Sequence, residues 1–161
     1  MSTYRIRPAE SADAELLVRW AQAMALETEH KRLEPATVAA GVAAGIADPL
    51  KARYFIAMQD APLAGRETIG SAVGTLMLTR EWSDWRNGDW WWIQSVYVDP
   101  PHRRQGVFAA LNRHVERSAR ATPGVIGLRL YVERGNVRAQ STYAALGMVD
   151  AGYGIFEAGF A

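Results

Sequence analysis

The stretch that decides the fold is residues 96–108, which read VYVDPPHRRQGVF. A strand-like apolar run stops at Asp99, two prolines follow, and a helix-like pattern starts close to Gly106. The first turn of a helix carries N–H groups without partners inside the helix, together with the positive end of the helix dipole. Glycine lets the backbone approach a ligand, and Arg103 and Arg104 add charge that suits phosphate. The residues therefore predict a site for an anion such as phosphate.

An alternative interpretation treats this turn as a solvated basic segment that only caps a helix. A single glycine favours that alternative when the turn is taken alone. The stretch matches neither the G-x-x-x-x-G-K-S/T loop nor a G-x-G-x-x-G sequence after a strand. The choice between the two interpretations therefore depends on the rest of the chain.

The chain has 161 residues, a length that fits one domain, and we expect residues 1–161 to form a single domain. It contains no cysteine, which excludes disulfides, thiolate metal sites and a cysteine nucleophile. The net charge of +1 argues against a nucleic-acid binder, which normally carries a clear basic excess. The longest uncharged run, residues 35–47, is shorter than the ~20 apolar residues of a spanning helix, and the N-terminus has no signal-peptide core. We therefore expect a cytoplasmic protein that does not bind membranes.

Apolar periodicity, prolines and glycines predict a series of strands and helices. Strands are expected at Tyr4–Ile6, ended by Pro8, and at Tyr54–Gln59, Ile69–Thr79, Trp90–Val98, Val125–Val132 and Val149–Phe156. Helices are expected at Ser11–Met24, with Ser11 as N-cap, and at Pro35–Asp48, Gln105–Arg120 and Asn136–Leu146, the last ending at Gly147. A turn is expected at Asp60–Gly65, and a polar, aromatic loop at Glu81–Gly88. This order predicts one mixed α/β domain.

A second stretch, residues 136–148, reads NVRAQSTYAALGM and places Asn136 and Tyr143 on one helix face. Together the two stretches resemble the main motifs of the GNAT superfamily of acyl-CoA N-acyltransferases. The first motif is a Val-Asp-Pro-like turn followed by the sequence [Arg/Gln]-x-x-Gly-x-[Gly/Ala]. The second is a helix that runs from Asn to Tyr and closes on Leu-Gly-Met. The element order also matches, so the resemblance covers essentially the whole chain. Phe108 departs from the family's Gly or Ala, so its side chain must point away from the pyrophosphate, into the core.

The resemblance implies a GNAT-like α/β (α+β mixed) fold: a mixed, mostly antiparallel central sheet, flanked by helices and splayed between two middle strands for acetyl-CoA. It implies that the main chain of Val96 to Val98 binds the pantetheine arm as one strand pairs with another. N–H groups of Arg104 to Phe108 are expected to cradle the pyrophosphate, and Asn136 to contact pantetheine or hold the neighbouring strand. The residues expected at the cofactor are Val96, Tyr97, Val98, Arg103, Arg104, Gln105, Gly106, Val107, Phe108 and Asn136.

Acetyl transfer from a thioester to an amine needs a neutral amine, donors for the oxyanion and a proton for the leaving thiolate. Tyr143 matches the family position of the proton donor, although a tyrosine on a buried helix face is commonly a core residue. A backbone N–H near Val96 or Tyr97 is the expected oxyanion donor. Some relatives carry an acidic base on the strand before the Asp-Pro turn, where this chain has Gln94, which cannot act as a base. The base is a water chain or one of Glu27, Glu29, Glu81 and Asp84. The alternative interpretation of each of these four residues is a solvated surface carboxylate without a catalytic role.

Two acidic clusters mark the expected acceptor side. Residues 27–30 (ETEH) follow the first predicted helix, and residues 81–85 (EWSDW) precede the central strand. Carboxylates beside tryptophans suit a cationic amine, although alternating tryptophans in a sheet also pack as core. The residues expected at the acceptor are Glu27, Glu29, Glu81, Asp84, Trp85 and Gln94. We therefore expect an acetyl-CoA-dependent N-acetyltransferase that acts on a primary amine, with a small cationic amine favoured.

Several alternatives stay open: a catalytically silent acyl-CoA-binding regulatory domain, a peptide or protein N-acetyltransferase, an acyl donor other than acetyl, and a homodimer instead of a monomer. A nucleic-acid binder that uses Arg103 and Arg104 is opposed by the near-neutral charge. The three histidines, His30, His102 and His114, show no metal-ligand spacing, so no metal is expected.

Overall fold

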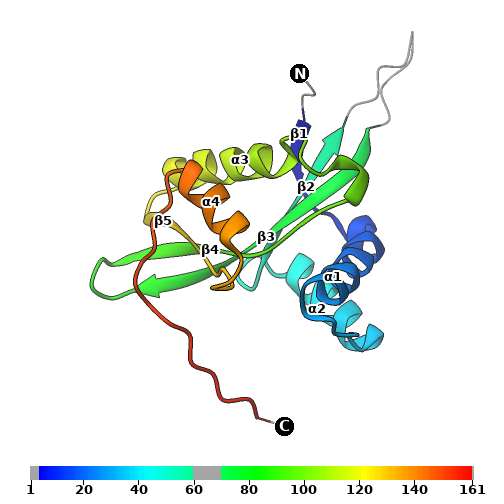
Figure 1. Ribbon diagram of the computed structural model, residues 1–161, viewed down its shortest axis with the longest axis horizontal. Coiled ribbons are helices and arrows are strands. Elements are labelled where there is room, and N and C mark those ends of the chain that lie inside the picture. Colours follow the sequence, from blue (N-terminus) through cyan, green and yellow to red (C-terminus); the bar gives the residue numbers. More distant parts are fainter. Residues whose placement is uncertain (1–3, 60–69, 161) are drawn as a thin grey trace. The chain divides into compact units, whose positions relative to one another are not determined.

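The computed structural model describes residues 4–59 and 70–160 (Figure 1). The chain divides after Leu130 into two compact units. The first unit contains β1 (Tyr4–Pro8), the 3-10 turn η1 (Ser11–Asp13), α1 (Ala14–Glu29), α2 (Pro35–Ala47), β2 (Arg53–Gln59), β3 (Ser71–Ser83), β4 (Gly88–Val98), η2 (Pro100–His102), α3 (Val107–Ala121) and β5 (Val125–Leu130). The second unit contains α4 (Val137–Ala145). The expected turn at Asp60–Gly65 and the first residue of the expected strand Ile69–Thr79 lie outside the described residues.

The sheet has the strand order β1-β2-β3-β4-β5. Neighbouring strands from β1 to β4 are antiparallel, and β5 pairs parallel to β4. The register between β3 and β4 shifts after the pair Met77 and Ser95, because Leu78 lies opposite Ile93. Gln94 is therefore an extra residue in β4, a β-bulge, which bends a strand and increases its twist. The mixed, mostly antiparallel sheet predicted from the sequence is confirmed.

The sheet is splayed between β4 and β5. Over the described residues, the ladder between these strands ends at Ile93 and Leu130, whereas β4 continues to Val98 and stays paired with β3. The splay begins directly after the bulge at Gln94. Half of β4 therefore keeps one neighbour only. The sheet opens beside β4, as predicted, but the strand across the opening, β5, is the edge strand of the described sheet and not a second middle strand.

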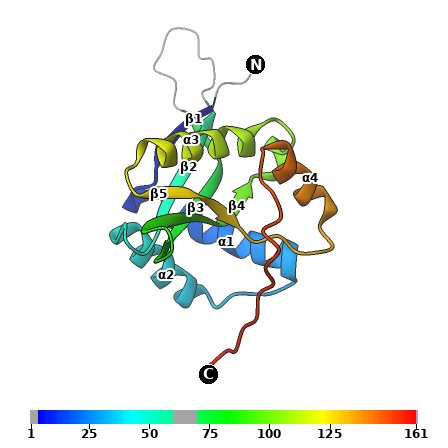
Figure 2. The same cartoon turned by 90° about the vertical axis from the view of Figure 1, so that its left-hand side faces the viewer.

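Helices cover both faces of this sheet (Figures 1 and 2). α3 places one stripe of residues against the first face, and its members Val107, Leu111 and Val115 pack with Val73 and Leu76. The spacing of this stripe matches the helical repeat, which explains why the sequence predicts α3 well. α1 and α2 cover the other face through a second cluster of buried residues, Leu17, Trp20, Val42 and Tyr97. None of the helices described is long and apolar enough to cross a membrane.

The predicted start and end of α1 differ from the structure. Ser11 is not an N-cap, because Glu10 precedes η1 and forms a capping box with Asp13. Asp13 also accepts two hydrogen bonds from Arg7, at 2.7 and 2.8 Å, which fixes the chain before the helix. The helix continues past Met24 to Glu29, since no proline or glycine interrupts it. Glu27 therefore belongs to the last turn of α1.

The loop predicted at Glu81–Gly88 is shorter in the structure. β3 continues to Ser83, and Glu81 lies opposite Trp90 in the β3–β4 ladder. The turn itself begins at Asp84 and ends before Gly88, with Asn87 at φ 44°, as expected of an Asn-Gly hairpin. Polar side chains misled the prediction because this end of the hairpin is exposed on both faces.

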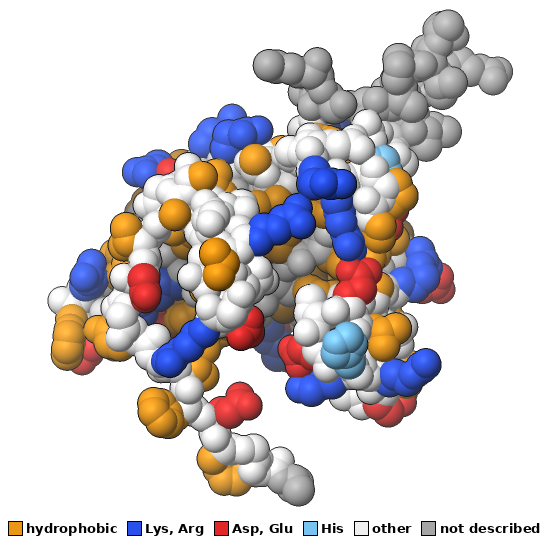
Figure 3. All heavy atoms as spheres, in the orientation of Figure 1, with side chains coloured by type: hydrophobic (Ala, Val, Ile, Leu, Met, Phe, Trp, Pro, Cys, Tyr) orange, Lys and Arg blue, Asp and Glu red, His pale blue; other side chains and the backbone are white. Residues whose placement is uncertain are grey.

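The second unit confirms the predicted helix and lacks the predicted final strand. Asn136 caps α4 by accepting a hydrogen bond from the Ala139 N–H at 3.0 Å, and Gly147 follows the helix at φ 83°. The described residues beyond it, 148–160, form no strand at the expected Val149–Phe156. Gly152 has φ 75°, outside the β region, and its N–H binds the Asp150 carboxylate at 2.8 Å. Apolar side chains along this segment are exposed (Figure 3).

Candidate functional site

The open part of β4 presents main-chain groups beside the splay. The Asp99 N–H donates to the Val73 carbonyl at 2.9 Å, so Asp99 and Val73 form a hydrogen-bonded pair. Because such pairs alternate along an antiparallel ladder, the main chain of Tyr97 faces β3. The N–H and carbonyl groups of Val96 and Val98 point the other way, toward the splay. The Val98 carbonyl among them accepts a hydrogen bond from Arg103, whereas the Val96 N–H and carbonyl and the Val98 N–H are available to an extended ligand that enters as a further strand.

The turn after β4 has a backbone suited to an anion. Arg104 lies at φ 62° and Gly106 at φ 86°, two left-handed positions just before α3 begins at Val107. Successive N–H groups in such a turn converge on a concave site that binds phosphate, and the start of α3 adds its dipole. The Gln105 side chain donates to the Pro101 carbonyl at 2.8 Å, which closes the turn from within.

The two residues that open α3 are held by the core. Val107 is fully buried, and Phe108 packs against the same cluster. This confirms the expectation that the Phe108 side chain points into the core. The substitution of a bulky residue for the family's Gly or Ala therefore leaves the main chain of the turn accessible.

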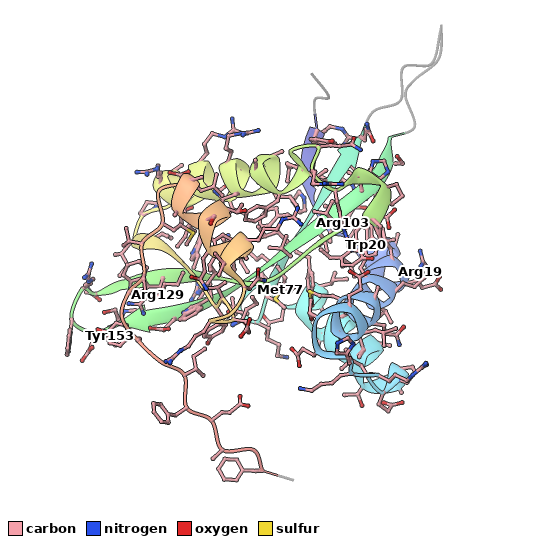
Figure 4. The ribbon with its side chains drawn as sticks, viewed as in Figure 1. Arg19, Trp20, Met77, Arg103, Arg129 and Tyr153 are labelled. Atoms are coloured by element: carbon pink, nitrogen blue, oxygen red, sulfur yellow. The ribbon has the colours of Figure 1, made fainter. Side chains whose placement is uncertain are left out.

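The Arg103 side chain turns back toward the sheet and α1. Its Nε donates to the Val98 carbonyl at 2.9 Å, and its Nη2 donates to a Glu27 oxygen at 2.7 Å. The guanidinium carbon lies 5.5 Å from the centre of the Tyr97 ring, and the Trp20 ring lies 5.8 Å from the same ring. Figure 4 labels Arg103 and Trp20 in this region. The structure thus brings together two residues that the sequence placed in different sites, Arg103 and Glu27.

Tyr97 is the buried centre of this contact. Its side chain is 8% exposed, and its hydroxyl lies 3.5 Å from the second Glu27 oxygen, a long contact. Burial, and after it the charge of Glu27, raises the pKa of the Tyr97 phenol. The phenol therefore stays protonated at neutral pH, so it is a hydrogen-bond donor and not a second anion.

Glu81 lies in a separate group of side chains near the hairpin. Its carboxylate accepts a hydrogen bond from Arg129 of β5 at 2.8 Å and another from the Trp92 indole. The Arg129 guanidinium lies over the Trp90 ring at 4.1 Å and reaches the Trp92 ring at 6.0 Å. An internal cation therefore already lies on the Trp90 and Trp92 rings of β4, whereas the Trp82 and Trp85 rings of the predicted acceptor cluster stay exposed.

The other predicted acceptor residues are dispersed. Glu29 pairs with Lys31 at 2.6 Å. Asp84 lies at the hairpin turn and accepts from the Trp85 N–H, while the Trp85 ring is 91% exposed. Gln94, at the bulge, donates to the Thr79 hydroxyl at 2.9 Å. Of the predicted acceptor set, Glu27 and Gln94 are on or next to the open part of β4, and Glu81, Asp84 and Trp85 belong to the hairpin.

Tyr143 and Asn136 belong to the second unit. Burial raises the pKa of the Tyr143 phenol, so the group keeps its proton at neutral pH, as a proton donor must. The Asn136 side-chain oxygen caps α4. Their expected roles at the cofactor stay predictions.

Sequence reasoning missed Arg129. The residue lies in an apolar strand, where a single charge is easily read as facing solvent. The signal that could have found it is the match between one arginine in β5 and the tryptophans at alternate positions of β4, since stacked cations are common on such rings.

A family model described as the acetyltransferase (GNAT) family matches residues 16–148. No curated protein matches the chain. Among solved structures, a possible acetyltransferase from Clostridium difficile 630 shares 34% identity with this chain at a TM-score of 0.86, and the match covers 98% of both chains.

Two more distant structures show the same fold. The ribosomal-protein-alanine N-acetyltransferase from Brucella melitensis biovar Abortus 2308 shares 15% identity at a TM-score of 0.71, over 98% of this chain and 100% of that chain. AAC(6')-Iy, solved with the bisubstrate analog CoA-S-monomethyl-acetylneamine, shares 18% identity at a TM-score of 0.74, over 99% of this chain and 100% of that one. The family model spans most of the chain, and the structure has the splayed sheet and the turn that the motifs predict. The chain therefore belongs to the acetyltransferase (GNAT) family.

Proposed function

We propose that this protein is an N-acetyltransferase that transfers an acetyl group from acetyl-CoA to a primary amine by direct attack. The observation that carries the proposal is the continuity of two features in the first unit. The open main chain of β4 leads directly into the turn with left-handed residues at Arg104 and Gly106. A ligand with an amide-containing arm next to a pyrophosphate matches this order of groups.

The residues fit the cofactor through their main chain. Val96 offers its N–H and carbonyl to the pantetheine arm and Val98 offers its N–H, and the N–H groups between Arg104 and Phe108 suit the pyrophosphate. Arg104 adds a positive charge beside these groups. Asn136, the last residue of the predicted cofactor set, is proposed to support the arm from the second unit.

The chain's residues have two tasks in the reaction, to stabilise the oxyanion and to protonate the leaving thiolate. Acetyl-CoA supplies a thioester whose carbonyl carbon an amine attacks, so that a C–N bond forms and the C–S bond breaks. The Val96 N–H is our candidate oxyanion donor, because it points away from β3 while the Tyr97 N–H faces β3. Tyr143 is our candidate acid, which gives its proton to the leaving sulfur. The proton lost by the amine passes to water, because Glu27, Glu29 and Glu81 are paired with arginine or lysine and Asp84 lies at the hairpin turn.

The acceptor is proposed to be a primary amine whose recognition does not depend on a second positive charge. The sequence favoured a small cationic amine, on the strength of Glu27, Glu29, Glu81 and Asp84. In the structure, Arg103 pairs with Glu27, Lys31 with Glu29, and Arg129 with Glu81. A substrate ammonium at Glu27, Glu29 or Glu81 would have to displace one of these cations, which limits the net gain from charge pairing. Asp84 lies apart from the open part of β4, at the hairpin turn, where it accepts from the Trp85 N–H.

The test is an amine panel with acetyl-CoA, in which thiol release is followed and each acetylated product is identified by mass. The panel pairs monoamines with diamines of the same chain length and adds peptides with free N-termini. We expect amine-dependent thiol release, with monoamines and diamines similar in kcat/KM. CoA binding without turnover of any amine would favour a silent acyl-CoA-binding domain. Turnover of peptides alone would favour a peptide N-acetyltransferase.

A further inference from the structure

We propose that Arg103 and Glu27 form a clamp that ties the last turn of α1 to the end of β4, so that Arg103 is a positioning residue and not a phosphate ligand. The inference rests on the proposed function, because it assigns a role within that donor site. The clamp is defined as Arg103, Glu27 and the Val98 carbonyl. Each of its contacts joins residues of the first unit.

The geometry commits the guanidinium of Arg103 to protein acceptors. Nε binds the Val98 carbonyl and Nη2 binds Glu27, and the group also lies near the Tyr97 ring. These two acceptors, one of them a carboxylate, fix the orientation of the guanidinium, so a phosphate could take only its remaining N–H groups without breaking a contact. A charge-assisted hydrogen bond to a carboxylate is about twice as strong as a neutral one, so exchanging Glu27 for a phosphate brings little gain.

The position of Glu27 provides a second, independent reason. Glu27 lies in the last turn of α1, where the helix dipole disfavours a negative charge, and that turn contains no basic residue. Its carboxylate is also next to the buried Tyr97 hydroxyl. The negative charge of Glu27 therefore destabilises the helix when it has no partner, and its pairing with Arg103 explains why a carboxylate lies at this position.

The clamp links the two sides of the site. Glu27 and Trp20 lie on one face of α1 and both contact Tyr97, whose backbone belongs to the open part of β4. Arg103 starts the anion turn and holds the Val98 carbonyl, which faces the splay. A change at either end of the pair therefore shifts both α1 and the donor strand. Among the described residues, Arg103 and not its neighbour Arg104 donates to Glu27 and to the Val98 carbonyl, so Arg104 is the matched control.

The experiment compares Glu27→Gln, Arg103→Gln, the double variant and Arg104→Gln, with acetyl-CoA and acetyl-pantetheine as donors. Acetyl-pantetheine lacks the whole nucleotide portion of CoA, so the ratio of the two kcat/KM values reports contacts to that portion, its phosphates included. We expect Glu27→Gln and Arg103→Gln to lower kcat/KM equally with both donors, and the double variant to be no worse than either. Arg104→Gln should lower the donor ratio by about ten-fold, the loss of one charge-assisted contact.

Two outcomes would overturn the clamp. One is a donor ratio that falls in Arg103→Gln while Glu27→Gln binds CoA equally well or more tightly. If Arg103 were a phosphate ligand, removing the Glu27 carboxylate would free its guanidinium to bind the phosphate. The other is strict additivity of the two substitutions in the free energy of unfolding, measured by urea denaturation, because a contacting pair must couple. The second measurement needs no activity. If the protein binds no CoA and acetylates no amine, the proposed function fails, while the unfolding cycle still decides whether the pair exists.

Discussion

Replacing Gly106 by alanine tests the main-chain phosphate turn directly, because the structure supplies a matched control. Gly106 has φ 86° and Gly124 has φ 81°, and a methyl group at either position would meet no atom within 4 Å. The two sites therefore impose the same backbone strain without a steric clash. Gly106 lies in the proposed pyrophosphate turn, whereas Gly124 lies just before β5.

The stability cost should be the same in both variants. A left-handed backbone costs an L-residue roughly 1–2 kcal/mol, and alanine regains about 0.4–1 kcal/mol because the unfolded chain loses entropy. The net loss is about 1 kcal/mol, which corresponds to a fall in Tm of about 2–4 °C for a chain of this size. Thermal unfolding followed by circular dichroism measures this for Gly106→Ala and Gly124→Ala side by side.

CoA affinity should separate the two variants. In Gly106→Ala the methyl group comes between the turn and a pyrophosphate that approaches its N–H groups, so at least one charge-assisted hydrogen bond is lost. We expect Kd for CoA, measured by titration calorimetry, to rise about ten-fold or more in Gly106→Ala and to stay unchanged in Gly124→Ala. Equal affinities in the two variants would refute the argument that the main chain of this turn contacts the pyrophosphate.

Three further substitutions test the chemistry and the fold. Tyr143→Phe should lower kcat by about 100-fold or more with little change in KM for acetyl-CoA, because a general acid is lost. Since burial raises the pKa of Tyr143, the kcat of the wild type should decline only above pH ~10. An unchanged kcat in Tyr143→Phe would remove Tyr143 from the mechanism. Leu111→Ala should destabilise the fold by roughly 3–5 kcal/mol in urea, because Leu111 is fully buried, against less than about 0.5 kcal/mol for the exposed Leu26→Ala. Asp13→Asn should lower the free energy of unfolding by about 1 kcal/mol at pH 7. The hydrogen bond from Arg7 lowers the pKa of Asp13 in the folded protein. The stabilisation by Asp13 is therefore present above the ordinary pKa of about 3.9 and is lost as the pH falls through the folded-state pKa. A difference between wild type and Asp13→Asn that persists at pH 2 would contradict this account.

The sequence predicts the elements whose apolar pattern matches one regular period. β4 and α3 are expected within two residues of their observed bounds, because alternation and the helical stripe both reflect burial against the sheet. Residues that interrupt the regular alternation of a strand were not predicted. Nothing local marks Gln94 as an extra residue in β4, because a bulge is defined by the register with β3. The opening beside β4 was expected from family resemblance and not from that local pattern.

The final strand shows the opposite error. Val149, Ala151, Tyr153 and Ile155 alternate as in a strand, but alternation describes only which side chains share a face. A strand also needs a neighbour that completes its backbone hydrogen bonds. The left-handed Gly152 and its contact with Asp150 give this segment a local turn instead. Period alone therefore overestimates strands where glycine is frequent.

The acceptor side shows why residue types cannot define a charged site. Carboxylates near tryptophans suggested a cationic substrate, yet the partners that change this conclusion are distant in sequence: Arg103 is 76 residues from Glu27, and Arg129 is 48 residues from Glu81. An exposed ion pair contributes only about 0–1 kcal/mol, so exchanging a guanidinium for a substrate ammonium changes the free energy by less than that. Charge pairing therefore gives a diamine little advantage over a monoamine. We therefore propose that selectivity for one amine depends on the shape of the surface beside the open part of β4, where Glu27 and Tyr97 lie.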